Sequence, residues 1–127
     1  SCKMPRIKIS AGDVSAFASL TDGPTAKLVW EALPIQASAS TWGDEIYFSI
    51  PVHTGTEPDA EAERQVGDIA YWPPGNAFCI FFGRTPMSGG DLPVAASPVN
   101  TLGTVEGDAK VFKAVRSGTR ITIEKAE

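Results

Sequence analysis

Hydrophobic and polar residues alternate along much of the chain with the period of two that is typical of β-strands. The alternation is clear over residues 6–10, 14–20, 45–50 and 120–124, and further apolar runs cover residues 35–39 and 99–105. Gly, Asp and Pro residues lie between these runs and favour turns. The pattern therefore predicts a chain built mainly from short antiparallel strands.

Residues 65–83, QVGDIAYWPPGNAFCIFFG, are predicted to form a hairpin around which the rest of the chain is organised. Side chains of its first arm alternate between two faces, with Ile69 and Tyr71 on one and Ala70 and Trp72 on the other. The second arm, FCIFF, is apolar at every position, which is typical of a strand buried on both sides. The PPGN turn combines two residues without an N–H group with two that tolerate positive φ. We expect this hairpin to lie at the centre of the core.

Helical spacing of apolar residues is confined to two short segments. The first is predicted over residues 24–33, where an early Pro favours the start of a helix and Pro34 ends it. The second follows a Gly-Asp pair, and its Val111, Phe112 and Val115 are expected to face inward. About eight short strands and two short helices predict a closed antiparallel β-barrel, because closure removes the exposed edges of a sheet.

Two polar segments separate these elements. Residues 53–64 are broken by Pro and rich in acids, which is typical of a solvated loop, with an acidic binding site as the alternative. Residues 84–98 contain too many Pro and Gly residues for a long element and are predicted to form an ordered loop, a kind of segment that often serves function.

Composition limits the classes of partner. A length of 127 residues with 43% hydrophobic content suits a single domain over residues 1–127. The net charge of −4 and the scattered basic residues argue against a nucleic-acid partner. No apolar run is long enough for a membrane helix, and Cys2 and Cys79 are expected to stay unpaired, so we expect a cytoplasmic protein. The composition does not indicate an oligomeric state.

The candidate reactive residues favour structural roles. His53 is the only histidine, so neither a His-rich metal site nor a Ser-His-Asp triad with a second histidine is expected, and no metal or cofactor is predicted. Cys79 lies in the apolar arm with no basic residue near it in sequence, and it is expected to pack in the core rather than act as a nucleophile.

The order of these parts resembles that of a cyclophilin. The resemblance is carried by PTAKLVWEALP at 24–34, Gly67-Asp68, FCIFFG at 78–83, and GTVEGDAKVFKAV followed by TRITIE within 103–124. The chain is more similar still to small prokaryotic cyclophilin-like proteins of uncharacterised function, through the stretch GDIAYWPPGNAFCIFFG. The resemblance implies a cyclophilin-like closed β-barrel over nearly the whole chain.

The catalytic residues of the cyclophilin family have no match here. Its prolyl isomerases hold the substrate with an Arg, together with Phe, Gln, Trp and His, but the corresponding segment IYFSIPV at 46–52 contains no Arg. Residues 84–98 also lack the family's Trp and His. The resemblance therefore implies the fold without assigned catalytic residues. Prolyl isomerase activity, the alternative function, would need Arg64 or Arg84 to lie over the groove.

A non-catalytic module that binds a small molecule or a peptide is the first functional hypothesis. Aromatic side chains near the central hairpin can form either packed core or the wall of a pocket. Asp68 can anchor a ligand by hydrogen bonds or satisfy turn amides, and Arg84 supplies a cation beside a Gly-rich turn. The expected ligand-binding residues are Tyr47, Phe48, Asp68, Tyr71, Trp72, Phe82 and Arg84.

Overall fold

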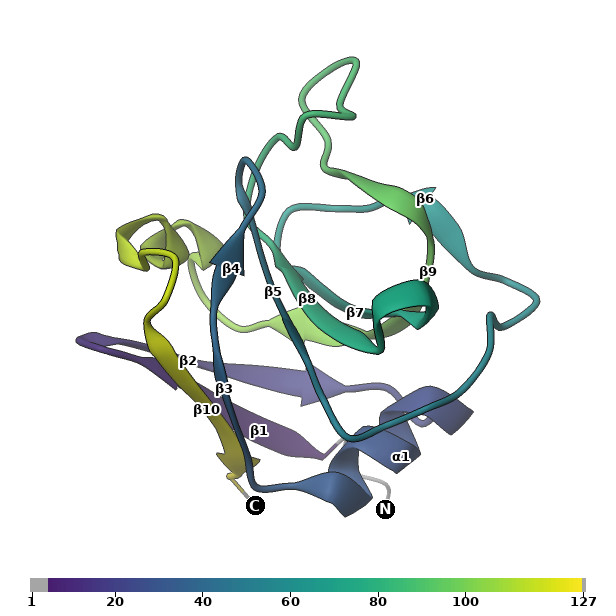
Figure 1. Cartoon of the computed structure of the whole chain (residues 1–127), viewed down its shortest axis with the longest axis vertical. Coiled ribbons are helices and arrows are strands. Elements are labelled where there is room, and N and C mark those ends of the chain that lie inside the picture. Colours follow the sequence, from purple (N-terminus) through teal and green to yellow (C-terminus); the bar gives the residue numbers. More distant parts are fainter. Residues whose placement is uncertain (1–4, 127) are drawn as a thin grey trace.

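The computed structural model describes residues 5–126, and β-strands dominate them (Figure 1). The strands are β1 (Arg6–Ala11), β2 (Val14–Leu20), β3 (Ile35–Ser38), β4 (Ser40–Thr41), β5 (Glu45–Ser49), β6 (Glu61–Glu63), β7 (Asp68–Trp72), β8 (Ala77–Phe81), β9 (Val94–Val105) and β10 (Arg120–Lys125). The helices are α1 (Pro24–Ala32) and the two 3-10 helices η1 (Pro73–Gly75) and η2 (Ala109–Ala114). The prediction of a mainly β chain with short helices is confirmed.

The strands form one antiparallel sheet in the order β3-β10-β1-β2-β9-β7-β8-β5-β4, with β6 paired to β9. The two ends of this order, β3 and β4, are separated along the chain by Ala39 alone. No strand pairing joins β3 to β4 within the described residues, so hydrogen bonds do not close the sheet. Figure 1 shows α1 at one end of the strands, while the loop between β8 and β9 projects at the opposite end.

The hairpin of β7 and β8 separates two apolar clusters, as its alternation predicted. Ile69 and Tyr71 point into the larger cluster, which also contains the buried side chains of β1, β2 and β10. Ala70 and Trp72 point to the opposite face, into or against a smaller cluster formed by Ala70, Ala77, Cys79, Phe81, Ala95 and Val99. Every residue of β8 is buried, because both clusters pack against it.

The two predicted helices are present with small differences. α1 covers residues 24–32 and buries Thr25, Ala26 and Val29. The second segment is a 3-10 helix in which Phe112 is buried, but Val111 is 43% exposed, so the expectation that Val111 faces inward is wrong. The i to i+3 repeat of a 3-10 helix turns Val111 away from the face that Phe112 buries. Within the described residues, no helix is both long and apolar enough to cross a membrane.

Both segments that were predicted as loops contain strand. Glu61–Glu63 forms β6, and β9 begins at Val94 rather than at residue 99. β6 and the first half of β9 pair with each other, with a register shift between Glu61 and Glu63, so each short segment finds backbone partners in the other. Glu57, from the same acidic segment, accepts a hydrogen bond from the Thr25 amide at the start of α1 at 3.2 Å. Ala95 and Val99, in the first half of β9, pack with the central hairpin in the smaller cluster.

Cys79 is buried and unpaired within the described part of the chain. Its packing in the smaller cluster agrees with the expected structural role. Cys2, the other residue of that expectation, lies outside the described residues.

Candidate functional site

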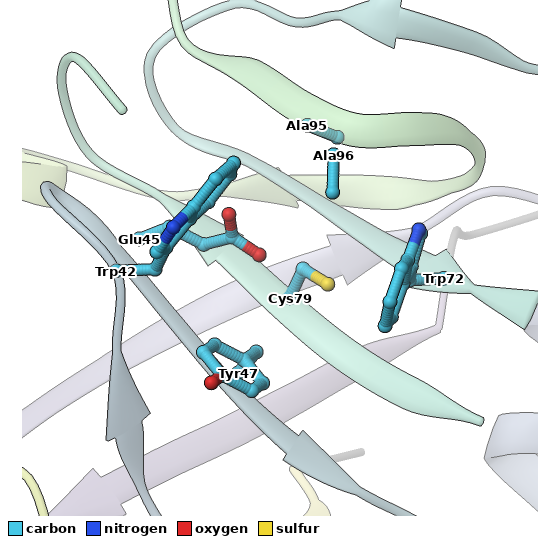
Figure 2. Close-up of a pocket in the computed structure, with 7 residues that line it drawn as sticks. All are labelled: Trp42, Glu45, Tyr47, Trp72, Cys79, Ala95 and Ala96. Atoms are coloured by element: carbon cyan, nitrogen blue, oxygen red, sulfur yellow. The ribbon is translucent and has the colours of Figure 1, made fainter. Parts of the chain in front are cut away.

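A pocket of about 270 Å³ opens over the smaller apolar cluster. Figure 2 shows the indole rings of Trp42 and Trp72 on opposite sides of this pocket, with the Glu45 carboxyl group and the Cys79 sulfur between them. Its lining residues are Trp42, Glu45, Tyr47, Trp72, Cys79, Ala95 and Ala96. The pocket is therefore mainly aromatic and aliphatic, and it contains one carboxyl group.

The strand register brings the floor of the pocket together. Glu45 and Tyr47 are two residues apart on β5, so their side chains project from the same face. Tyr47 lies opposite Cys79 of the neighbouring β8, which places the thiol beside the ring. Trp72, at the end of β7, projects from this same face of the hairpin. The adjacent strands β7, β8 and β5 thus bring these four lining side chains to one face of the sheet.

Trp42 is positioned by a tight turn between β4 and β5. The Trp42 amide donates to the Glu45 carbonyl oxygen at 2.9 Å, and the Glu45 amide donates to the Trp42 carbonyl oxygen at 3.2 Å. Gly43 is the first of the two residues between them and has a φ of +61°, which is the requirement of a type II′ hairpin turn. The turn therefore fixes Trp42 directly across from Glu45.

The Trp72 ring is held on two sides. Its indole Nε1–H donates to the Oγ atom of Ser97, a residue in the first half of β9, at 2.6 Å. On its other side the ring lies against Gly75, where an added Cβ would be only 2.8 Å from the nearest ring carbon. A hydrogen-bonded and closely packed indole presents a rigid wall, because it has little rotational freedom to lose when a ligand binds.

Glu45 is the group with the least satisfied environment in the pocket. The residue is 5% exposed, and its Oε1 atom has no hydrogen-bond partner within the described residues. Burial raises the pKa of Glu45 from 4.5 to about 7, and a hydrogen bond from the Cys79 thiol partly opposes this increase. Near neutral pH this carboxyl group can therefore donate or accept a proton.

The Cys79 thiol is not poised for nucleophilic chemistry. Burial raises the pKa of Cys79 well above its ordinary value, and the nearby charge of Glu45 raises it further. The thiol also lies 3.9 Å from the Ala77 carbonyl oxygen, a second acceptor for its proton. A thiol that holds its proton this firmly acts as a weak hydrogen-bond donor in the pocket floor.

The expected aromatic site residues lie on both faces of the sheet. Tyr47 and Trp72 line the pocket. Phe48, Tyr71 and Phe82 belong to the larger cluster and are at most 3% exposed. The reason is the strand alternation, which turns Phe48 away from Tyr47 and Tyr71 away from Trp72. Of the aromatic residues predicted from sequence, the structure thus brings two together in the pocket.

The expected polar site residues lie outside the pocket lining. Asp68 Oδ2 accepts a hydrogen bond from the Gln65 amide at 2.9 Å and lies 3.8 Å from Arg64 Nε, so it stabilises the turn before β7. Arg84 is exposed, and its backbone oxygen accepts from the Asp44 amide at 2.8 Å. Within the described residues, no basic side chain lines this pocket.

Sequence reasoning missed five of the lining residues. A signal was present for two of them, because Glu45 is two residues from Tyr47 on a predicted strand and the turn TWGD places Trp42 across from Glu45. Cys79 was recognised as buried but not as part of a pocket floor. Ala95 and Ala96 gave no signal, since their place depends on where β9 begins.

The comparisons with known proteins agree with the observed architecture. The family described as Cyclophilin-like matches residues 5–124. Among solved structures, the chain is similar to the hypothetical protein AF2241 from Archaeoglobus fulgidus, determined in solution, with 35% sequence identity, a TM-score of 0.83, and coverage of 97% of this chain and 95% of that one. Among curated proteins no match is found. Because the family match spans nearly every described residue, this chain belongs to the cyclophilin-like family.

Proposed function

We propose that this protein binds a small organic molecule in the pocket between Trp42, Tyr47 and Trp72. The observation that carries the proposal is the Oε1 atom of Glu45, which is buried at an aromatic pocket without a hydrogen-bond partner in the described residues. Buried polar atoms in folded proteins are nearly always satisfied, so an unsatisfied one in a pocket is a natural anchor for a bound molecule.

The size of the pocket favours a small ligand over a long one. Its volume of about 270 Å³ lies near the lower end of the range of roughly 300–1,000 Å³ that is usual for small-molecule sites. A peptide would place no more than one side chain in such a space. The rigid indole of Trp72 and the buried floor at Cys79 supply apolar contact, and Glu45 supplies orientation.

The three tryptophans provide a direct test of this proposal. Trp42 and Trp72 line the pocket, whereas Trp30 lies on α1 beside a separate and smaller pocket, with its ring centroid 4.8 Å from the Lys125 ammonium nitrogen, and it reports binding outside the proposed site. In an NMR screen of small organic molecules, bound compounds should shift the indole N–H signals of Trp42 and Trp72 and leave that of Trp30 in place. A screen in which no compound shifts those two signals would contradict the proposal.

We also propose that the sheet is a closed barrel, in which the segment of residues 35–41 joins the two ends of the strand order. This segment pairs with β10 through β3 and with β5 through β4. At its middle, the Ala39 amide donates to the Thr119 carbonyl oxygen at 2.8 Å. Hydrogen exchange should then protect the Ala39 amide as well as the amides of the inner strands. Rapid exchange of Ala39 would indicate an open edge at this position.

A further inference from the structure

We propose that the ligand of this pocket carries an alkylammonium group that bears at least one N–H, held between the faces of Trp42 and Trp72 and hydrogen-bonded to Glu45. This inference rests on the proposed function and specifies its chemical class. It follows from three features of the pocket: its charge, its aromatic faces and the unsatisfied oxygen.

The charge of the pocket favours a cation. Glu45 is the one acidic residue among the lining residues, and none of them is basic. A buried carboxylate without a partner is unfavourable, and an opposite charge from the ligand relieves that cost. In its carboxylate form, Glu45 would instead repel an anionic ligand.

The aromatic walls also favour a cation. Figure 2 shows both indole rings nearly edge-on, so that their faces are turned toward the space between them. The faces of aromatic rings carry negative electrostatic potential, and tryptophan binds cations more strongly than tyrosine or phenylalanine does. Trp72 keeps its orientation through the hydrogen bond to Ser97 Oγ, so its face is available without rearrangement.

The unsatisfied oxygen distinguishes between kinds of cation. In the carboxylate form that prevails above pH 7, Glu45 Oε1 needs a hydrogen-bond donor, which an ammonium group with an N–H provides and a quaternary ammonium group does not. A metal ion is a poor fit, because the described residues contain no cluster of three or more His, Cys, Asp or Glu side chains that could hold one. The pocket therefore matches a protonated amine with an apolar body.

Binding of such a cation should depend on pH with a defined direction. The titratable groups around the Glu45 carboxyl are the Cys79 thiol from β8 and the Tyr47 phenol from β5, while β9 contributes only Ala95 and Ala96. Because the pKa of Glu45 is about 7 in the free protein, the carboxylate form that attracts a cation increases as the pH rises through 7. The affinity for an ammonium ion should rise over the same range and then level off.

Three matched probes test the inference: cyclohexylammonium, cyclohexanol and cyclohexanecarboxylate, each titrated at pH 8 against the indole N–H signals. Cyclohexylammonium should shift the Trp42 and Trp72 signals and bind at least about tenfold more tightly than the other two. The N,N,N-trimethyl derivative should bind more weakly than cyclohexylammonium, because it cannot donate to Glu45 Oε1.

The Glu45→Gln variant removes the charge with almost no change in shape. It should lose the preference for cyclohexylammonium over cyclohexanol and the pH dependence of binding, while Glu124→Gln, at an exposed position on β10, should keep both. Dispersed NMR spectra of both variants establish that they are folded.

Two outcomes would overturn the inference. If cyclohexanol or cyclohexanecarboxylate bound in the pocket as tightly as the amine, the proposed function would stand and the ammonium assignment would fall. If none of the three probes bound, the ammonium assignment would also fall. The broader screen would then decide separately whether the pocket binds any small molecule.

Discussion

At the scale of single residues, the buried carboxyl group of Glu45 is energetically unfavourable, and it is also the polar anchor of the proposed ligand site. The residue is buried, its carboxyl group lies in a pocket lined by residues of several other segments, and its Oε1 atom remains unsatisfied within the described residues. Groups of this kind reduce stability, and proteins retain them where a site requires them. We therefore expect Glu45 to cost stability in the absence of a ligand, in a way that depends on pH.

The pH dependence of that cost follows from the two states of the chain. In the folded protein Glu45 keeps its proton up to a pH of about 7, whereas the unfolded chain loses it above about 4.5. The folded state then binds more protons between these values, so the free energy of unfolding falls as the pH rises from about 4.5 to about 7 and afterwards levels off. The decrease in the free energy of unfolding that is attributable to Glu45 is up to about 3 kcal/mol.

Urea denaturation of the natural protein and of Glu45→Gln at pH 4, 6 and 8 measures this effect. The natural protein should lose stability relative to the variant as the pH increases, because glutamine does not titrate. Other titrating groups are common to both proteins and cancel in the difference. A difference that stays constant over this pH range would contradict the raised pKa of Glu45.

At the scale of elements, the turn η1 determines the position of a pocket wall. Gly75 allows the Trp72 ring to pack against this turn, since a Cβ would lie 2.8 Å and 2.9 Å from two of the ring carbons. Gly75→Ala should therefore displace the indole and lower the free energy of unfolding by about 1–3 kcal/mol, as overpacking does elsewhere.

The matched control is Gly89→Ala, where an added Cβ would have no heavy atom within 4 Å. Tryptophan indole NMR signals and urea denaturation distinguish the two variants. Gly75→Ala should move the Trp72 signal and weaken ligand binding, while Gly89→Ala should do neither. Equal behaviour of the two variants would show that the Trp72 ring does not depend on the turn.

At the scale of the whole molecule, the chain belongs to the cyclophilin-like family, but no basic side chain of the described residues lines the pocket. Arg64 is occupied by Asp68, at 3.8 Å, and by a hydrogen bond to Thr101, while Arg84 is exposed and outside the pocket lining. A positioned donor typically contributes about 10²–10³ in rate. A protease-coupled assay on an Ala-Pro peptide should therefore show absent or very weak acceleration over the uncatalysed rate.

An ordinary cyclophilin provides the positive control for this assay. Should the two proteins show comparable rates, another residue must supply the charge. Arg64→Ala and Arg84→Ala would then identify it, and the binding hypothesis would give way to an enzymatic one.

Local pattern predicted the elements well where their periodicity was strong. The alternation of Ile69, Ala70, Tyr71 and Trp72 assigned each side chain to its correct face, because period two is a property of the strand itself. The same rule separates Phe48 from Tyr47 on β5 and assigns Phe48 to the larger cluster rather than to the predicted ligand site. Val111 and the start of β9 were missed, since a 3-10 helix and the pairing of a three-residue strand with a segment that contains Pro98 leave weak local signals.

The sequence by itself determined most of the strands, the central hairpin with its two apolar faces, and the resemblance to the cyclophilin-like family. These features depend on residues that are near one another in the chain or in fixed order along it. The assembled pocket was decided by the tertiary structure, because the turn that holds Trp42 and Glu45 meets Trp72 and Ala95 only when the sheet has formed. The burial of Glu45, and with it the raised pKa, exists only once those segments have met, since desolvation is a property of the whole surroundings of a group.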